Sequence, residues 1–125
     1  MQIPFHKTYT TEDELNAVIE KTEGDLNFAL AKTRMEIEKL MREILNKRTT
    51  INENSSQDIK FLPLTKLFTA LTVLHPSFKE YQHSFRYVQS ICNAAIHGQK
   101  ISYGQAEEAL QLGIILINEL KKIKA

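Results

Sequence analysis

Residues 26–45 read LNFALAKTRMEIEKLMREIL, and this stretch decides the fold class. Its core-type positions recur at alternating intervals of four and three residues: Leu26, Leu30, Thr33, Ile37, Leu40 and Ile44. This spacing places them on one face of an α-helix. The charged residues alternate in sign on the other side, among them Arg34, Glu38 and Arg42, and we interpret them as a solvated face. No segment shows the two-residue alternation of a half-buried strand, so the sequence predicts an all-α fold.

The residues before this stretch predict a further helix. Thr11 and Glu14 have the spacing of a capping box, which opens an acidic helix over residues 11–23. Gly24 ends or kinks that helix, and Asp25 can cap the next one. On the other side of the stretch, residues 49–60 are polar without periodicity and predict a surface loop.

Three further helical segments follow the loop. The first has Pro63 in its first turn and ends before His75 and Pro76. The second starts near Ser77 and stops at Gly98, with an apolar stripe formed by Phe78, Tyr81, Phe85, Val88, Cys92 and Ala95. The third opens with a second capping box, Ser102 and Gln105, and is apolar around nearly its whole circumference. We expect this last helix to be central to the bundle or covered by another subunit.

The predicted architecture is an up-and-down bundle of four main helices with an additional N-terminal helix. We expect one domain over residues 1–125, in which residues 1–24 are appended to a bundle of residues 25–125. The 125 residues, 42% of them hydrophobic, suffice for one core, and the formal charge of +1 is not that of a dedicated polyanion binder. No apolar run is long enough for a signal peptide or a membrane span, so we expect a cytoplasmic protein with no membrane association.

Several kinds of site are disfavoured by the sequence. Cys92 is the single cysteine, so it has no partner for a disulfide or a paired-thiolate zinc site. Because it falls in an apolar stripe, we interpret it as a buried, inert thiol. The four glycines are scattered, which excludes a glycine-rich phosphate loop. No carboxylate lies four residues from His97, and we expect neither a metal ion nor another cofactor.

One polar row stands out beside the apolar stripe of residues 78–95. Arg86, Gln89, Asn93 and His97 are separated by three, four and four residues, so they share one helix face. Such a row is either the ordinary solvated side of an amphipathic helix or a binding surface. The position of His97 favours the second interpretation, because it lies at a helix end close to the N–H groups that begin the next helix at Ser102.

The segments Leu30-Ala-Lys-Thr-Arg-Met-Glu-Ile-Glu-Lys-Leu-Met-Arg-Glu-Ile-Leu and Ile91-Cys-Asn-Ala-Ala-Ile-His-Gly, with an amphipathic last helix, resemble the HEPN superfamily (higher eukaryotes and prokaryotes nucleotide-binding). The resemblance covers residues 25–122 and points to the family's bacterial, uncharacterised branch. It implies a small, usually dimeric helical bundle whose active members are metal-independent ribonucleases. Asn93 and His97 match the polar residue and the histidine of the family's motif. Cys92 stands where the family has arginine, and a thiol has no permanent charge to hold a phosphate.

Three functions remain open on this resemblance. The first is a non-catalytic HEPN-like module that binds RNA, a nucleotide or a protein partner through a groove lined by Arg86, Gln89, Asn93, His97 and Lys100. The second is a toxin-type endoribonuclease, paired with an antitoxin, in which His97 is the catalytic residue and a basic residue from elsewhere replaces the missing charge. The third is a purely structural dimerisation domain. The missing arginine favours the first, and in each case we expect a homodimer.

Overall fold

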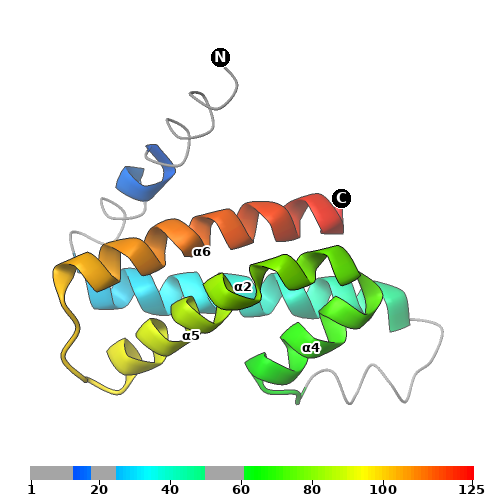
Figure 1. The fold of residues 1–125 in the computed structure, drawn as a ribbon, viewed down its shortest axis with the longest axis horizontal. Helices are drawn as coiled ribbons and strands as arrows, with labels where there is room; N and C mark the ends of the chain where they lie inside the picture. Colours follow the sequence, from blue (N-terminus) through cyan, green and yellow to red (C-terminus); the bar gives the residue numbers. More distant parts are fainter. Residues whose placement is uncertain (1–12, 18–24, 50–60) are drawn as a thin grey trace.

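The computed structural model describes residues 13–17, 25–49 and 61–125, and within these ranges it contains helices and no strand (Figure 1). The elements are α2 (Leu26–Thr49), α4 (Leu64–Leu74), the 3-10 helix η1 (Pro76–Tyr81), α5 (Gln82–Ile96) and α6 (Tyr103–Lys124). A short helical segment at residues 13–17 lies beside them. The prediction of an all-α bundle with an additional N-terminal helix is confirmed.

Helix α2 begins where the sequence predicts. The backbone N–H of Phe28 donates to Asp25 Oδ1 at 3.0 Å, so Asp25 caps the helix. The predicted stripe faces the core, with Leu26 partly buried and the other members buried, and Ala29, Met41 and Leu45 widen this face. Burial of so broad a face is what holds a 24-residue helix in place.

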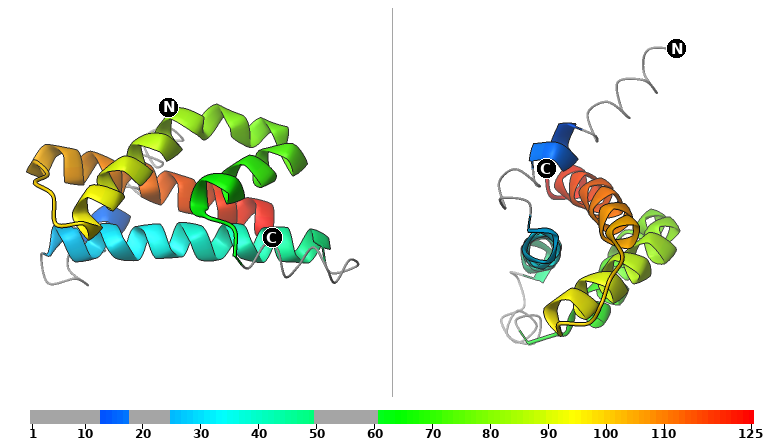
Figure 2. Two further views of the ribbon diagram at one scale, coloured as in Figure 1. Left: turned by 90° about the horizontal axis from the view of Figure 1, so that it is seen from below. Right: turned by 90° about the vertical axis from the view of Figure 1, so that its left-hand side faces the viewer.

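Helix α6 runs in the same direction as α2 and lies against it along its length (Figures 1 and 2). Thr33 of α2 lies opposite Gly113 of α6, and Glu43 lies 2.8 Å from the Nζ atom of Lys124. The capping box at Ser102 and Gln105 is present with both of its hydrogen bonds. Ile115 is the one exposed aliphatic side chain of α6. The chain itself therefore covers most of the apolar circumference of α6, chiefly with α2 and α5.

Helix α5 returns antiparallel to α6. Tyr81, just before α5, hydrogen-bonds Glu119, and Tyr87 hydrogen-bonds Glu108. The later tyrosine contacts the earlier glutamate, so α5 and α6 run in opposite directions. Burial raises the pKa of both tyrosine hydroxyls above the ordinary value, and the neighbouring carboxylates add to the effect.

The start of α5 differs from the prediction. Pro76 opens a 3-10 helix that continues to Tyr81, and the α-helix begins only at Gln82, not near Ser77. The tighter 3-10 turn directs Phe78 into the core beside Phe68, which stacks on Phe85 with ring centroids 4.2 Å apart. Pro63 is also displaced by one position from the prediction, because it is the N-cap of α4 and not part of its first turn.

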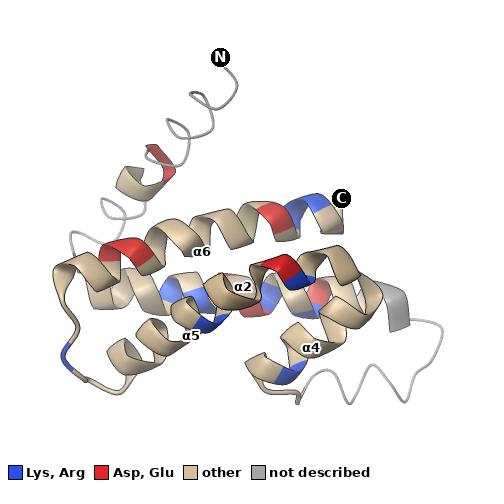
Figure 3. Cartoon of the chain, in the orientation of Figure 1, with Lys and Arg blue, Asp and Glu red and all other residues tan. Residues whose placement is uncertain are grey.

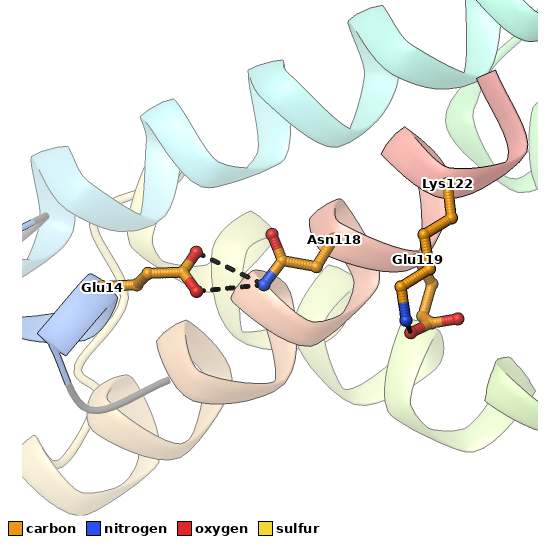
Figure 4. Close-up of polar contacts among 4 residues, drawn as sticks. All are labelled: Glu14, Asn118, Glu119 and Lys122. Carbon is orange, nitrogen blue, oxygen red and sulfur yellow. Dashed lines mark hydrogen bonds and ion pairs between the residues drawn. The ribbon is translucent and has the colours of Figure 1, made fainter. Parts of the chain in front are cut away.

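The N-terminal helical segment is anchored on α6. Leu15 is buried, and the Nδ2 atom of Asn118 donates to both carboxylate oxygens of Glu14, at 3.2 and 3.3 Å (Figure 4). The predicted cap at Thr11, the break at Gly24 and residues 50–60 of the predicted loop lie outside the described residues, whereas Thr49, predicted to begin that loop, is the last residue of α2. The segment therefore packs onto the bundle through residues 13–17.

Within the described ranges, no helix has both the length and the continuous apolar character that crossing a bilayer requires.

Candidate functional site

The C-terminal end of α5 is shaped by a glycine. Gly98 has φ +71°, a left-handed conformation that other residues adopt only with strain. Its N–H donates to the carbonyl of Ala95 at 3.1 Å, and the N–H of Gln99 reaches the carbonyl of Ala94 at 2.8 Å. These two bonds close the helix, and they leave His97 exposed at its C-cap, as the sequence predicts.

The predicted polar row lies along one edge of α5. Arg86 and His97 are exposed, as is Lys100 in the loop that follows, whereas Gln89 and Asn93 are partly buried. The Gln89 Nε2 atom donates to Thr65 Oγ1 of α4 at 2.9 Å. Gln89 thus joins α5 to α4, and Asn93 is the next member of the row beyond that junction.

The stretch of chain that carries this row has charges of one sign only. No Asp or Glu occurs between Gln82 and Ala106, whereas Arg86 and Lys100 are both present (Figure 3). Within the described part of the chain, neither cation forms an ion pair with a carboxylate. The edge is therefore a small positive surface on a protein of nearly zero net charge.

Cys92 lies inside the bundle behind this edge. Its side chain is 0% exposed, and burial raises its pKa to about 11, against the opposing effect of the nearby Arg34 guanidinium. At neutral pH it is therefore a protonated thiol, neither a nucleophile nor a cation. This geometry agrees with the interpretation of Cys92 as a buried, inert thiol.

Arg34 is the residue of this region that the sequence interpretation missed. It belongs to the charged row of α2 expected to be solvated, but the Glu38 and Arg42 side chains of that row are only 27% and 26% exposed. Arg34 itself is partly buried, and its Nε atom is buried without a hydrogen-bond partner. The expectation of a solvated face is wrong here, because these positions flank the core stripe and α4 and α5 pack over them. The sequence did contain an indication of this burial. Arg34, Glu38 and Arg42 are spaced so that they lie next to the buried residues Leu30 and Met41 on the surface of the helix.

A hollow lies on the opposite side of α2, between its C-terminal half and the end of α6. It has a volume of about 390 Å³ and is lined by Glu36, Lys39, Leu40, Glu43, Lys121, Lys124 and Ala125. Its charges are mixed, and hydrogen bonding by Lys124 lowers the pKa of Glu43 despite partial desolvation. Nothing in this lining selects a ligand charge. No cluster of three or more potential metal ligands occurs among the described side chains either.

Comparison with protein-family models, curated proteins and solved structures finds no match. The functional interpretation therefore depends on the residues of the α5 edge and on the resemblance carried by residues 30–45 and 91–98.

Proposed function

We propose that this chain is a HEPN-like helical module that binds RNA through the edge of α5 and does not cleave it. The observation that supports this proposal is the acid-free stretch from Gln82 to Ala106, on which Arg86, His97 and Lys100 are exposed. Unpaired cations on one edge attract a polyanionic backbone, because binding releases the counterions condensed on it. Among RNA, a nucleotide and a protein partner, a row of this length fits a strand with several phosphates best.

We propose that the chain does not cleave RNA because of the residue at position 92. Stabilising the pentavalent transition state of phosphodiester cleavage requires a cation or donor aimed at the phosphate oxygens. The family's arginine would stand at Cys92, which is buried and neutral. His97 alone can donate or accept a proton, but it does not supply the lost permanent charge. The toxin-type endoribonuclease, with its antitoxin partner, is therefore the second choice.

The proposal also keeps the homodimer that the resemblance implies. The apolar surface of α6 does not require a second subunit, because α2, α5 and residues 13–17 cover it. Sedimentation equilibrium of the purified chain decides between monomer and dimer, and a monomer would leave the α5 edge to act within one chain.

The binding proposal is tested with a fluorescent single-stranded RNA in EDTA. We expect anisotropy to report binding while a denaturing gel shows intact RNA. Replacing both edge cations, in Arg86→Gln/Lys100→Gln, should weaken binding about tenfold and lower the salt dependence by about two counterions. The matched control, Lys39→Gln/Lys121→Gln, removes the same charge from the opposite hollow and should bind as the wild type does.

Three results would contradict the proposal in different ways. Equal losses in both double variants would mean that net charge, not the α5 edge, governs binding. RNA cleavage that disappears in His97→Ala would establish the endoribonuclease. Absence of any RNA binding by the wild type would favour the structural dimerisation domain.

A further inference from the structure

Arg34 is a cation for which the described structure provides no counter-charge. Its Nε atom is buried without a hydrogen-bond partner, and no described carboxylate pairs with its guanidinium. Glu38, one helical turn away, is engaged by Arg42 at 2.7 Å. Leaving a buried guanidinium donor unsatisfied is costly, because the group loses water without gaining an acceptor.

Two contacts show which edge of the bundle Arg34 occupies. The Arg42 Nη2 atom of α2 donates to the carbonyl of Leu62 at 3.1 Å, and Gln89 of α5 donates to Thr65. The beginning of α4, which contains both acceptors, therefore lies across the same edge of α2 and α5. From this junction Arg34 is two turns back along α2, on the side of the helix that carries Arg42.

Asn93 lies in the same direction from the junction. Helices α2 and α5 run in opposite directions, and the C-terminal end of α5 lies beside the N-terminal half of α2 in Figure 1 and in the left view of Figure 2. Asn93 therefore lies beyond Gln89 on α5 in the same direction in space in which Arg34 lies beyond Arg42 on α2. The closeness of Arg34 to Cys92, the neighbour of Asn93, agrees with this placement.

The chemistry of this position selects an oxyanion. A guanidinium presents planar, forked donors that match two oxygens of a phosphate. α5 carries no carboxylate that could pair with Arg34, and Glu38 is already paired with Arg42. Within the described residues, no carboxylate therefore competes with an acceptor that a ligand would bring to Arg34.

We infer that Arg34 binds a phosphodiester oxyanion of the RNA at the α2–α5 edge, where it supplies from α2 the forked cation that position 92 of α5 lacks. This inference rests on the proposed function. It assigns phosphate binding to a residue outside the polar row of α5. Arg34 and Asn93 would then contact the same ligand from two different helices.

The experiment compares Arg34→Gln with the matched control Lys32→Gln, which removes one exposed cation from the same helix. We expect Arg34→Gln to weaken binding of the single-stranded RNA about tenfold, and Lys32→Gln to change it less than about twofold. Arg34→Lys keeps the charge but loses the fork, so it should fall between them. Circular dichroism melts establish that each variant is folded, and Arg34→Lys serves if Arg34→Gln is not.

A second readout does not depend on RNA. The Arg34 Nε–H resonance in a ¹⁵N-correlated NMR spectrum should shift on titration with inorganic phosphate and should not shift with equal chloride. Wild-type RNA binding that Arg34→Gln and Lys32→Gln weaken equally would overturn the inference and leave the proposed function standing. If the wild type binds no RNA, the proposed function fails. The resonance then decides the inference, since a shift with phosphate supports an oxyanion site at Arg34 and no shift removes it.

Discussion

Thr33 of α2 and Gly113 of α6 meet so closely that a Cβ atom built on Gly113 would lie 2.5 Å from Thr33 Cγ2. The Thr33 hydroxyl donates to the Ala29 carbonyl at 2.8 Å, so its rotamer is fixed and the methyl group has no easy way to turn aside. The distance between the two parallel helices is therefore set by the absence of a side chain at position 113.

Gly113→Ala should lower the free energy of unfolding by about 1–3 kcal/mol, because overpacking outweighs the gain in helix propensity. Urea denaturation measures the change. Gly104→Ala is the control, since a Cβ there meets nothing within 4 Å, and it should cause no loss. Thr33→Ser, which removes the methyl group and keeps the hydroxyl, should restore stability to Gly113→Ala. Equal effects at the two glycines would contradict the close approach.

Cys92 should make stability fall in alkaline solution. Burial raises its folded pKa to about 11 from an ordinary value of 9.0, so the folded state keeps a proton that the unfolded state loses. The contribution is complete below about pH 9 and is lost as the pH rises through about 11, by about 3 kcal/mol in all. Denaturation from pH 7 to 11 measures it, and Cys92→Ala should have a shallower decline. Parallel curves for the two proteins would contradict the raised pKa.

Cys92→Arg should destabilise the bundle and should not create a ribonuclease. The side chain at position 92 is 0% exposed, and a second guanidinium would be buried near Arg34. We expect a loss of about 3 kcal/mol or more in the free energy of unfolding. Thermal melts followed by circular dichroism measure it, with Cys92→Ala as the smaller substitution. Full stability together with RNA cleavage would show that arginine finds room at this position.

His97→Ala should change the free energy of unfolding by less than about 0.5 kcal/mol, because the side chain is exposed. Gly98→Ala should cost about 1 kcal/mol, because alanine is strained at φ +71°. Urea denaturation of both variants separates a functional histidine from a structural glycine. A loss of several kcal/mol in His97→Ala would mean that the histidine supports the fold.

The helix ends and core stripes were predictable because they depend on local chemistry. Asp25, Ser102 and Gly98 satisfy or close their own helix ends, and their roles follow from residue type and position. The burial of Cys92 followed from its place in an apolar stripe in the same way. These features need no knowledge of which helix packs on which.

The remaining features depend on neighbours that one segment does not specify. The Arg34 row was interpreted as solvated because its alternating charges stabilise an exposed helix equally well. Only the packing of α4 and α5 over that flank of α2 shows which positions lose water. The 3-10 helix before α5 was missed for a similar reason, since it is accompanied by the packing of Phe78 on Phe68, a residue of another helix.

The two tyrosine–glutamate contacts that join η1 and α5 to α6 also provide an optical reporter. The chain has four tyrosines and no tryptophan, so ultraviolet signals from Tyr81 and Tyr87 are not masked by indole. Both hydroxyls hydrogen-bond carboxylates of α6 and resist ionisation. In an alkaline titration of the unlabelled protein, the part of the tyrosinate absorbance that appears above the ordinary tyrosine pKa therefore reports on these two contacts with α6.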